Sequence, residues 1–211
     1  MAGIARTHLR VAWGAFKLHR RVFILSVLVL FASWVSLELA VVALQRLGVA
    51  VNVLLHLGFL ILFSGLMVGL HEMALQAVAG HPPAVSTLTA SLARGPSYLL
   101  ALCLYLVAVA AGVLLLVAPG IYLAVRYALF GQVLAAENVS GLDAWRAAGS
   151  LSQGRWWMLF RFLLVVAALN LAGAALLGVG LLVTFPVTVL ATSSLYRTLA
   201  GQGEAAKAPR A

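Results

Sequence analysis

The sequence predicts an all-α membrane protein whose chain crosses the bilayer six times, as three helical hairpins. Of its 211 residues 64% are hydrophobic and 9% are charged, whereas a soluble domain carries about 25% charged residues. The mean hydropathy is +1.09. Three times along the chain, a polar and partly basic lead-in segment also runs into a pair of long apolar segments. The lead-ins pass through LHRRVFI (Leu18–Ile24), LARGPSYL (Leu92–Leu99) and LSQGRWWM (Leu151–Met158).

A helix needs about 20 apolar residues to cross the bilayer core, and six segments reach or approach that length. We expect a basic amphipathic lead-in at residues 1–21, a membrane domain at 22–199 and a disordered tail at 200–211. The first span exceeds the apolar region of a signal peptide, so we expect it to be retained. The predicted spans are 22–44, 51–78, 97–117, 120–136, 157–177 and 180–199.

The cations indicate how the chain is oriented. The amino terminus, the two long joins and the carboxyl tail together hold eleven Lys and Arg residues, whereas the three short joins hold only Arg46. Because cytoplasmic segments are enriched in Lys and Arg, both termini are predicted to be cytoplasmic. The net charge of +9 then indicates contact with anionic lipid headgroups and no nucleic acid.

The three lead-ins mix apolar and basic residues, which permits two interpretations. Such segments form helices that lie flat among the headgroups with the apolar side down. They could equally be cytoplasmic extensions of the spans that follow. We expect amphipathic interfacial helices on the cytoplasmic side, and the second interpretation stays open.

The second half of the chain carries a recognisable order of motifs. PGIYLAVRYALF begins at Pro119, Glu137 follows, LDAWRAAGSLSQGRWW begins at Leu142, and FPVTVLATSSLYRTL ends at Leu199. This order resembles the bacterial six-span family that includes the membrane domain of glycerophosphodiester phosphodiesterases and YciC-like inner-membrane proteins. The resemblance implies a six-span fold in the bacterial inner membrane. It does not imply phosphodiesterase activity, which resides in a separate TIM-barrel domain that needs about 250 residues.

Two charged residues within the spans are the first candidates for function, because a charge there costs roughly 2.5–3.5 kcal/mol. Glu38 lies near the outer end of the first span, and Arg126 follows the Pro119–Gly120 turn by seven residues. At 1.5 Å per residue both lie about 10–12 Å below the outer surface. We therefore predict an intramembrane ion pair, acting either as a structural staple or as part of a gate or ion pathway.

A second group of polar residues is predicted at the cytoplasmic side: His71, Glu72 and Arg94. Glu72 is expected to pair with Arg94 or with an amino-terminal arginine. The segment HEMALQ lacks the second histidine of the H-E-x-x-H zinc motif. No metal or other cofactor is therefore predicted.

The last two spans carry a row of polar residues, Asn170, Thr184, Thr188 and Thr192. The threonines are four residues apart and so share one helix face. The row either lines a cavity or packs helices together. Close helix contact is also expected at Gly65-x-x-x-Gly69. Four aromatic residues are predicted to anchor the spans at the membrane interface: Tyr98, Trp156, Trp157 and Tyr196.

The sequence contains no catalytic residue set, since it has one Asp, one Cys and no G-x-S-x-G motif. We therefore expect a non-enzymatic protein that organises lipid or partner proteins at the cytoplasmic face. The alternative is a small transporter, channel or transporter subunit with a polar cavity near Glu38, Arg126 and Thr188. Membrane lipids are the expected partners, and a membrane-protein partner or a second copy of the chain stays open.

Overall fold

The computed structural model describes residues 2–44, 46, 48–176 and 179–207, and every regular element among them is a helix. The prediction of an all-α fold is confirmed. The elements are α1 (Ala2–Leu44), α2 (Val49–Val78), α3 (Ser86–Ala90), the 3₁₀ turn η2 (Leu92–Arg94), α4 (Gly95–Leu115), α5 (Val117–Tyr127), α6 (Phe130–Glu137), α7 (Gly141–Leu151), α8 (Trp156–Ala175) and α9 (Leu181–Lys207).

Five helical stretches are long and apolar enough to cross a membrane, so the chain has the character of a multi-pass membrane protein. The sixth predicted span, residues 180–199, forms part of α9 and is not among the five. Its threonines, serines and Pro186 lower its hydropathy. Six spans and their arrangement across the bilayer therefore stay predictions. The five stretches are Gly3–Leu44, Val49–Val78, Leu92–Leu115, Val117–Glu137 and Trp156–Ala175.

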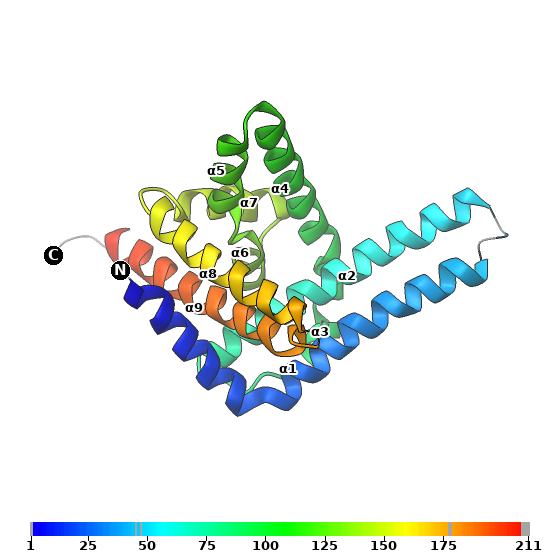
Figure 1. The fold of residues 1–211 in the computed structure, drawn as a ribbon, viewed down its shortest axis with the longest axis horizontal. Coiled ribbons are helices and arrows are strands. Elements are labelled where there is room, and N and C mark those ends of the chain that lie inside the picture. Colours follow the sequence, from blue (N-terminus) through cyan, green and yellow to red (C-terminus); the bar gives the residue numbers. More distant parts are fainter. Residues whose placement is uncertain (1, 45, 47, 177–178, 208–211) are drawn as a thin grey trace.

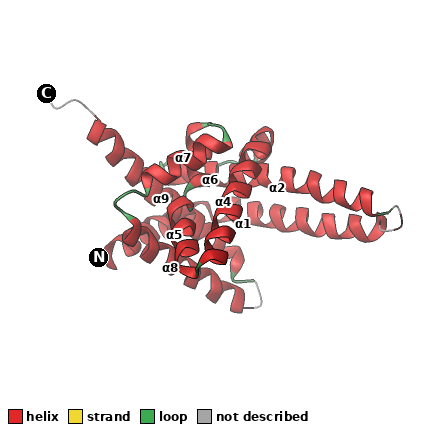
Figure 2. Ribbon diagram, turned by 90° about the horizontal axis from the view of Figure 1, so that it is seen from above, coloured by secondary structure: helices red, strands yellow, loops and turns green. Residues whose placement is uncertain are grey.

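The helix α1 consists of two helices joined at His19, whose backbone angles (φ −114°, ψ 25°) are not helical. After this kink α1 pairs with α2, and the two form an arm that extends away from the rest of the protein (Figures 1 and 2). Within the arm the rings of Trp34 and Phe59 meet edge to face, 5.6 Å apart. Other apolar side chains stay exposed, such as Phe31 (64%) and Leu54 (68%). A continuous apolar surface of this kind suits lipid rather than water.

Before the kink, α1 packs on α9. Ala12 and Phe16 are buried in the core. His8 Nδ1 lies 2.8 Å from Ser194 Oγ, and the imidazole meets the ring of Phe162 edge to face. One face of the first lead-in therefore packs on protein, whereas Val11, Trp13 and Leu18 stay exposed, so an interfacial position for this segment stays a prediction. Four-residue spacing identifies the face of a helix that becomes covered, but not what covers it.

The second lead-in forms α3 and η2, which lie against α2 at its glycines. A Cβ atom at Gly69 would lie 2.5 Å from Leu88 Cα, and one at Gly65 would lie 2.7 Å from Leu92 Cα. Only glycine permits such an approach of two backbones. The close contact predicted for Gly65-x-x-x-Gly69 thus occurs within the chain.

The core is built around α9, which packs against α1, α2 and α8 (Figure 1). Its side chains Leu190 and Leu195 are almost completely buried, together with Phe23 of α1 and Phe162 of α8. A second cluster joins α2, α4, α6 and α7 around Tyr98. These two clusters hold α5, α7 and the start of α8 beside one another, where the candidate site lies.

The structure differs from the expectation at two places. The fourth predicted span, residues 120–136, lies within Val117–Glu137, one of the five stretches able to cross a membrane. It contains a break, however: α5 ends at Tyr127 and α6 begins at Phe130, because Leu129 (φ −93°, ψ 9°) leaves the helical conformation. The tail predicted to be disordered continues α9 as far as Lys207. Alanine and lysine in this tail favour the helical conformation. The preceding turns of α9 already form the nucleus from which the helix can continue. Residues 208–211 lie outside the described part of the chain.

Candidate functional site

The predicted ion pair between Glu38 and Arg126 does not form. Glu38 is exposed on the arm, and the ion pairs among the described residues are Arg94–Glu72 and Arg146–Asp143. Arg126 belongs to α5, which packs against α4, α7 and α8. Counting residues from a turn estimates depth in the membrane, but it does not say which helices are neighbours.

Arg126 instead lies in a cluster of aromatic rings. Its Nη1 donates a hydrogen bond of 2.9 Å to Tyr122 Oη, and its Cζ lies 5.8 Å and 5.7 Å from the ring centroids of Tyr122 and Tyr127. Trp145 of α7 stacks on Tyr127 at 4.0 Å, and Trp156 of α8 stacks on Tyr122 at 6.0 Å. We call these five residues the Arg126 cluster.

The elements around Arg126 are positioned by local features of the sequence. Tyr122 and Arg126 are four residues apart on α5 and so share a face. The helix α7 is capped at its amino-terminal end by Ser140, whose Oγ accepts a hydrogen bond from Asp143 N. Gly149 then lets α7 approach α5, since a Cβ there would lie 2.8 Å from the Tyr127 ring.

The third lead-in supplies two of the five residues of the cluster. Trp156, the first residue of α8, donates from Nε1 to Tyr122 O at 3.3 Å, and Trp145 lies on α7. Two of the four aromatic residues around Arg126 therefore come from the segment predicted to lie at the cytoplasmic face, and the other two, Tyr122 and Tyr127, come from α5 itself.

Two N–H groups of this cluster have no acceptor. Arg126 Nε and Trp145 Nε1 are both buried and have no hydrogen-bond partner among the described residues. The side chains of Arg126 and Trp145 contact the same ring, that of Tyr127. A buried donor without an acceptor costs about 1–3 kcal/mol.

None of the carboxylates that the structure describes forms an ion pair with Arg126. The sequence has only five acidic residues. Glu72 pairs with Arg94, Asp143 pairs with Arg146, and Glu137 accepts from Tyr196 Oη at 3.0 Å. Glu38 is on the arm, and the side chain of Glu204 lies outside the described part. Among the described residues, the guanidinium of Arg126 has no ion-pair partner, and the groups against it are two aromatic rings and the phenol oxygen of Tyr122.

The predicted cytoplasmic-side group is divided by the structure. Arg94 and Glu72 form an ion pair in which each side chain is 22% exposed, and Ser91 Oγ donates to Glu72 Oε2 at 2.5 Å. His71 lies apart from them: its Nδ1 bonds to Met67 O at 2.6 Å, and its ring lies against Tyr98. Glu72 and Arg94 join α2 to η2, whereas His71 packs between α2, α4 and Gly131 of α6.

The four predicted interface anchors lie in different surroundings. Tyr98 and Tyr196 are buried within the protein, so they do not face lipid. Trp156 is half-buried in the Arg126 cluster. Trp157 is 66% exposed and is the one of the four with a freely accessible ring. A tyrosine near the end of an apolar helix can thus serve tertiary packing as readily as membrane anchoring.

The polar row on α9 takes part in helix packing. Asn170 Nδ2 of α8 donates to Thr188 Oγ1 at 3.1 Å, and Gln132 Nε2 of α6 donates to Thr192 Oγ1 at 2.8 Å. Thr184 lies against Gly173 of α8, where an added Cβ would meet its Oγ1 at 2.2 Å. Of the two interpretations of this row, the contacts correspond to helix packing.

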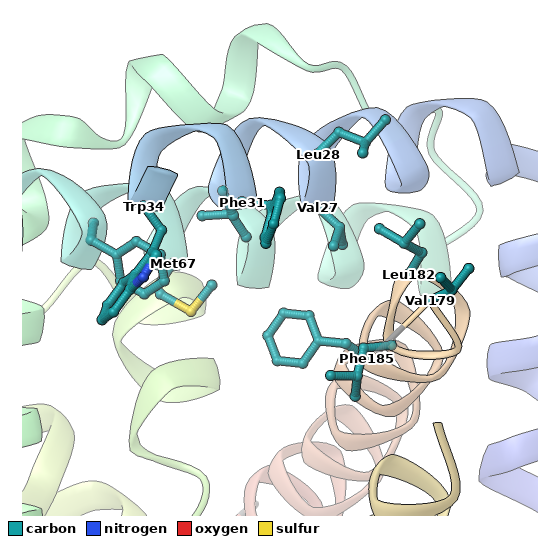
Figure 3. A pocket seen from close by; sticks show the side chains of 11 residues that line it. Val27, Leu28, Phe31, Trp34, Met67, Val179, Leu182 and Phe185 are labelled. Atoms are coloured by element: carbon teal, nitrogen blue, oxygen red, sulfur yellow. The ribbon is translucent and has the colours of Figure 1, made fainter. Parts of the chain in front are cut away.

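An apolar groove of about 600 Å³ lies between the arm and the start of α9 (Figure 3). Phe31 and Trp34 of α1 face Met67 of α2 and Phe185 of α9 across it. Hydrocarbon, aromatic and thioether groups make up nearly all of its lining. The groove is lined by Val27, Leu28, Leu30, Phe31, Trp34, Phe63, Met67, Val179, Leu181, Leu182 and Phe185.

The sequence argument missed Tyr122, Tyr127, Trp145 and Gln132. The first two flank Arg126 in the sequence, and that proximity was an available signal. No group of three His, Cys, Asp or Glu side chains among the described residues is arranged to hold a metal ion. No family model matches the chain, and no curated protein or solved structure matches it either.

Proposed function

We propose that the chain is a non-enzymatic, multi-pass protein of a bacterial inner membrane that holds membrane lipid and organises it at the cytoplasmic face. The observation that carries this proposal is the apolar groove between the arm and α9. Its occupant is the acyl chain of a lipid.

The chemistry of the groove favours an acyl chain over water or a polar solute. Water needs two to four polar partners to occupy a cavity, and the lining supplies almost none. The lining residues of α1 and α2 belong to two helices able to cross a membrane, so the surrounding medium is hydrocarbon. A flexible chain that fills the space recovers the van der Waals contacts that an empty groove would lose.

Two observations support the proposed orientation and family. The beginning of α1 and the end of α9 lie at the same end of the molecule, away from the tip of the arm (Figures 1 and 2). That arrangement suits two termini on one side, where the cations concentrate. Glu137 and Tyr196, both part of the pattern that resembles the six-span family, are joined by a hydrogen bond.

The transporter alternative requires its polar groups to share one cavity. Among the described residues, Glu38 is exposed on the arm, Arg126 lies in the aromatic cluster, and Thr188 is bonded to Asn170. The groove that the structure does contain is apolar. Lipid binding therefore has the stronger support of the two.

Native mass spectrometry of the gently extracted protein tests the proposal. The wild type is expected to retain lipid, and Val27→Trp, which fills the groove from α1, is expected to lose it. The matched control is Val107→Trp, because Val107 is exposed on α4 outside the groove. Equal retention by both variants would exclude the groove as the lipid site. A stoichiometric protein partner in place of lipid would move the function to organising that partner.

A further inference from the structure

We propose that one anionic phospholipid binds along α1, with its phosphate in a basic pocket at the kink and an acyl chain in the apolar groove. This inference rests on the proposed function for the acyl chain, and it adds a site for the headgroup. The basic pocket has a volume of about 460 Å³ and is lined by Lys17, Leu18, His19, Arg20, Arg21 and Val22.

The pocket lies where α1 bends. The backbone of His19 leaves the helical conformation, and the helix changes direction in this region (Figure 1). A straight helix points successive side chains about 100° apart, whereas six residues in a row line one space here. The volume falls within the range of small-molecule sites, so a phosphate and the glycerol attached to it can enter.

The charge of the pocket selects an anion. Lys17, Arg20 and Arg21 are exposed cations that line the same space, and like charges held so close repel one another. The ion pairs among the described residues join η2 to α2 and lie within α7, so these three cations have no carboxylate partner there. Phosphate suits them because its several oxygens accept charge-assisted hydrogen bonds from lysine and arginine.

The position of the pocket selects a lipid as the source of that phosphate. The first predicted span begins at Val22, directly after the arginines. Trp13 (46% exposed) and Leu18 (77% exposed) present apolar surface on the same side of the span, as is typical of segments at the boundary between headgroups and hydrocarbon. A lipid phosphate lies at that boundary, so the proposal commits to a headgroup rather than to an acidic protein.

The spacing along α1 connects the pocket to the groove. The helix is regular from Arg20 onward, and the groove residues Val27 and Phe31 follow Arg20 by seven and eleven residues, which places all three on one face. Seven residues span about 10 Å, and the headgroup layer on each side of a bilayer is roughly 5–8 Å thick. Because these lengths are similar, one lipid can place its phosphate at the kink and its chain in the groove.

The test titrates three ligands onto the full chain in neutral detergent micelles, and native mass spectrometry counts the bound molecules. Phosphatidylglycerol carries phosphate and acyl chains, diacylglycerol carries the chains alone, and inorganic phosphate lacks the chains. Replacing both Arg20→Gln and Arg21→Gln is expected to weaken phosphatidylglycerol binding about 25-fold, a factor of about five for each cation. The same double variant is expected to bind diacylglycerol as the wild type does.

The matched control replaces both Arg6→Gln and Arg10→Gln. It removes the same charge from the same helix, and both arginines are exposed and outside the pocket. If this control weakens phosphatidylglycerol binding as much as the Arg20 and Arg21 variant, the effect is general surface charge and the proposal is overturned. Unchanged phosphatidylglycerol affinity in the Arg20 and Arg21 variant, or an equal loss of diacylglycerol, also overturns it. Far-UV circular dichroism checks that both variants stay folded.

Val27→Trp separates the basic pocket from the groove. It is expected to weaken phosphatidylglycerol and diacylglycerol and to leave inorganic phosphate unaffected. If Val27→Trp loses lipid and the Arg20 and Arg21 variant does not, the proposed function stands and this inference fails. If Val27→Trp keeps diacylglycerol, the groove is not the acyl-chain site and the proposed function fails.

The number of bound lipids decides whether one molecule occupies both sites. One phosphatidylglycerol per chain, lost in either variant, supports a single lipid that spans the kink and the groove. Two molecules, each removed by a different variant, overturn that assignment. Inorganic phosphate that binds as tightly as phosphatidylglycerol would make the ligand a soluble anion, which also overturns it.

Discussion

Replacing Gly69 by alanine is expected to push α3 away from α2. The new Cβ would lie 2.5 Å from Leu88 Cα and 2.9 Å from Thr87 O. Both are backbone atoms, so no side chain can turn aside to make room. Raising the first distance to an ordinary contact of about 3.4 Å requires a shift of roughly 0.9 Å. Overpacking of this kind costs about 1–3 kcal/mol.

A shift of α3 would also disturb the Glu72 carboxylate on the facing helix. Ser91 follows α3 and donates to it at 2.5 Å, so the loss of stability includes part of that contact. The assay is the midpoint of thermal unfolding of the full chain in mild detergent. For a domain of this size, 1 kcal/mol corresponds to about 2–4 °C, so a fall of several degrees is expected.

The control is Gly58→Ala on the same helix. Gly58 has no atom within 4 Å of an added Cβ, and alanine favours helix over glycine by up to about 1 kcal/mol. This variant is expected to unfold at the wild-type temperature or slightly above. If Gly69→Ala and Gly58→Ala behave alike, α3 does not approach α2 as described, and the reasoning from backbone contact fails.

Three further predictions concern the charged and phenolic groups. Glu72→Gln and Arg94→Gln are expected to be non-additive in a double-mutant cycle, with a coupling of about 0.5–3 kcal/mol, because the pair is mostly buried; additive losses would contradict the contact. Tyr196→Phe removes the hydrogen bond to Glu137 and is expected to cost about 1–3 kcal/mol, measured as a lower unfolding midpoint; an unchanged midpoint would show that this bond is not stabilising. Glu38→Gln is expected to change stability by less than about 0.5 kcal/mol, because the side chain is exposed on the arm; a large loss would restore the case for a buried ionic partner.

The length of the apolar segments predicted the helices. A segment that crosses a membrane must hydrogen-bond its own backbone N–H and C=O groups, and a helix does so. The predicted spans 22–44, 97–117 and 157–177 agree with α1, α4 and α8 to within a few residues, apart from the amino-terminal extension of α1. The break near Leu129 was not predictable in this way. Its neighbours are all apolar, and only packing distinguishes one long helix from two short ones.

The candidate site was only partly predictable. Arg126 was singled out as a charge in an apolar segment, but Trp145 lies 19 positions further along the chain. Its contact with Tyr127 depends on how α7 docks on α5, and Gly149, which permits that approach, is one of 19 glycines in the sequence. Single-sequence patterns report local structure, whereas the partner of an arginine is decided by tertiary packing.

The central position of α9 has a consequence for the order of synthesis and membrane insertion. The helix that α1 packs on is made after all the other described helices, so His8 and Phe16 have no α9 to cover them until α9 itself has been synthesised. The hydroxyl groups of α9 also find their partners on α6 and α8, which are already present. The helices α1 to α8 thus provide the surface on which α9 packs. The amino-terminal part of α1 becomes covered only when α9 has packed on it.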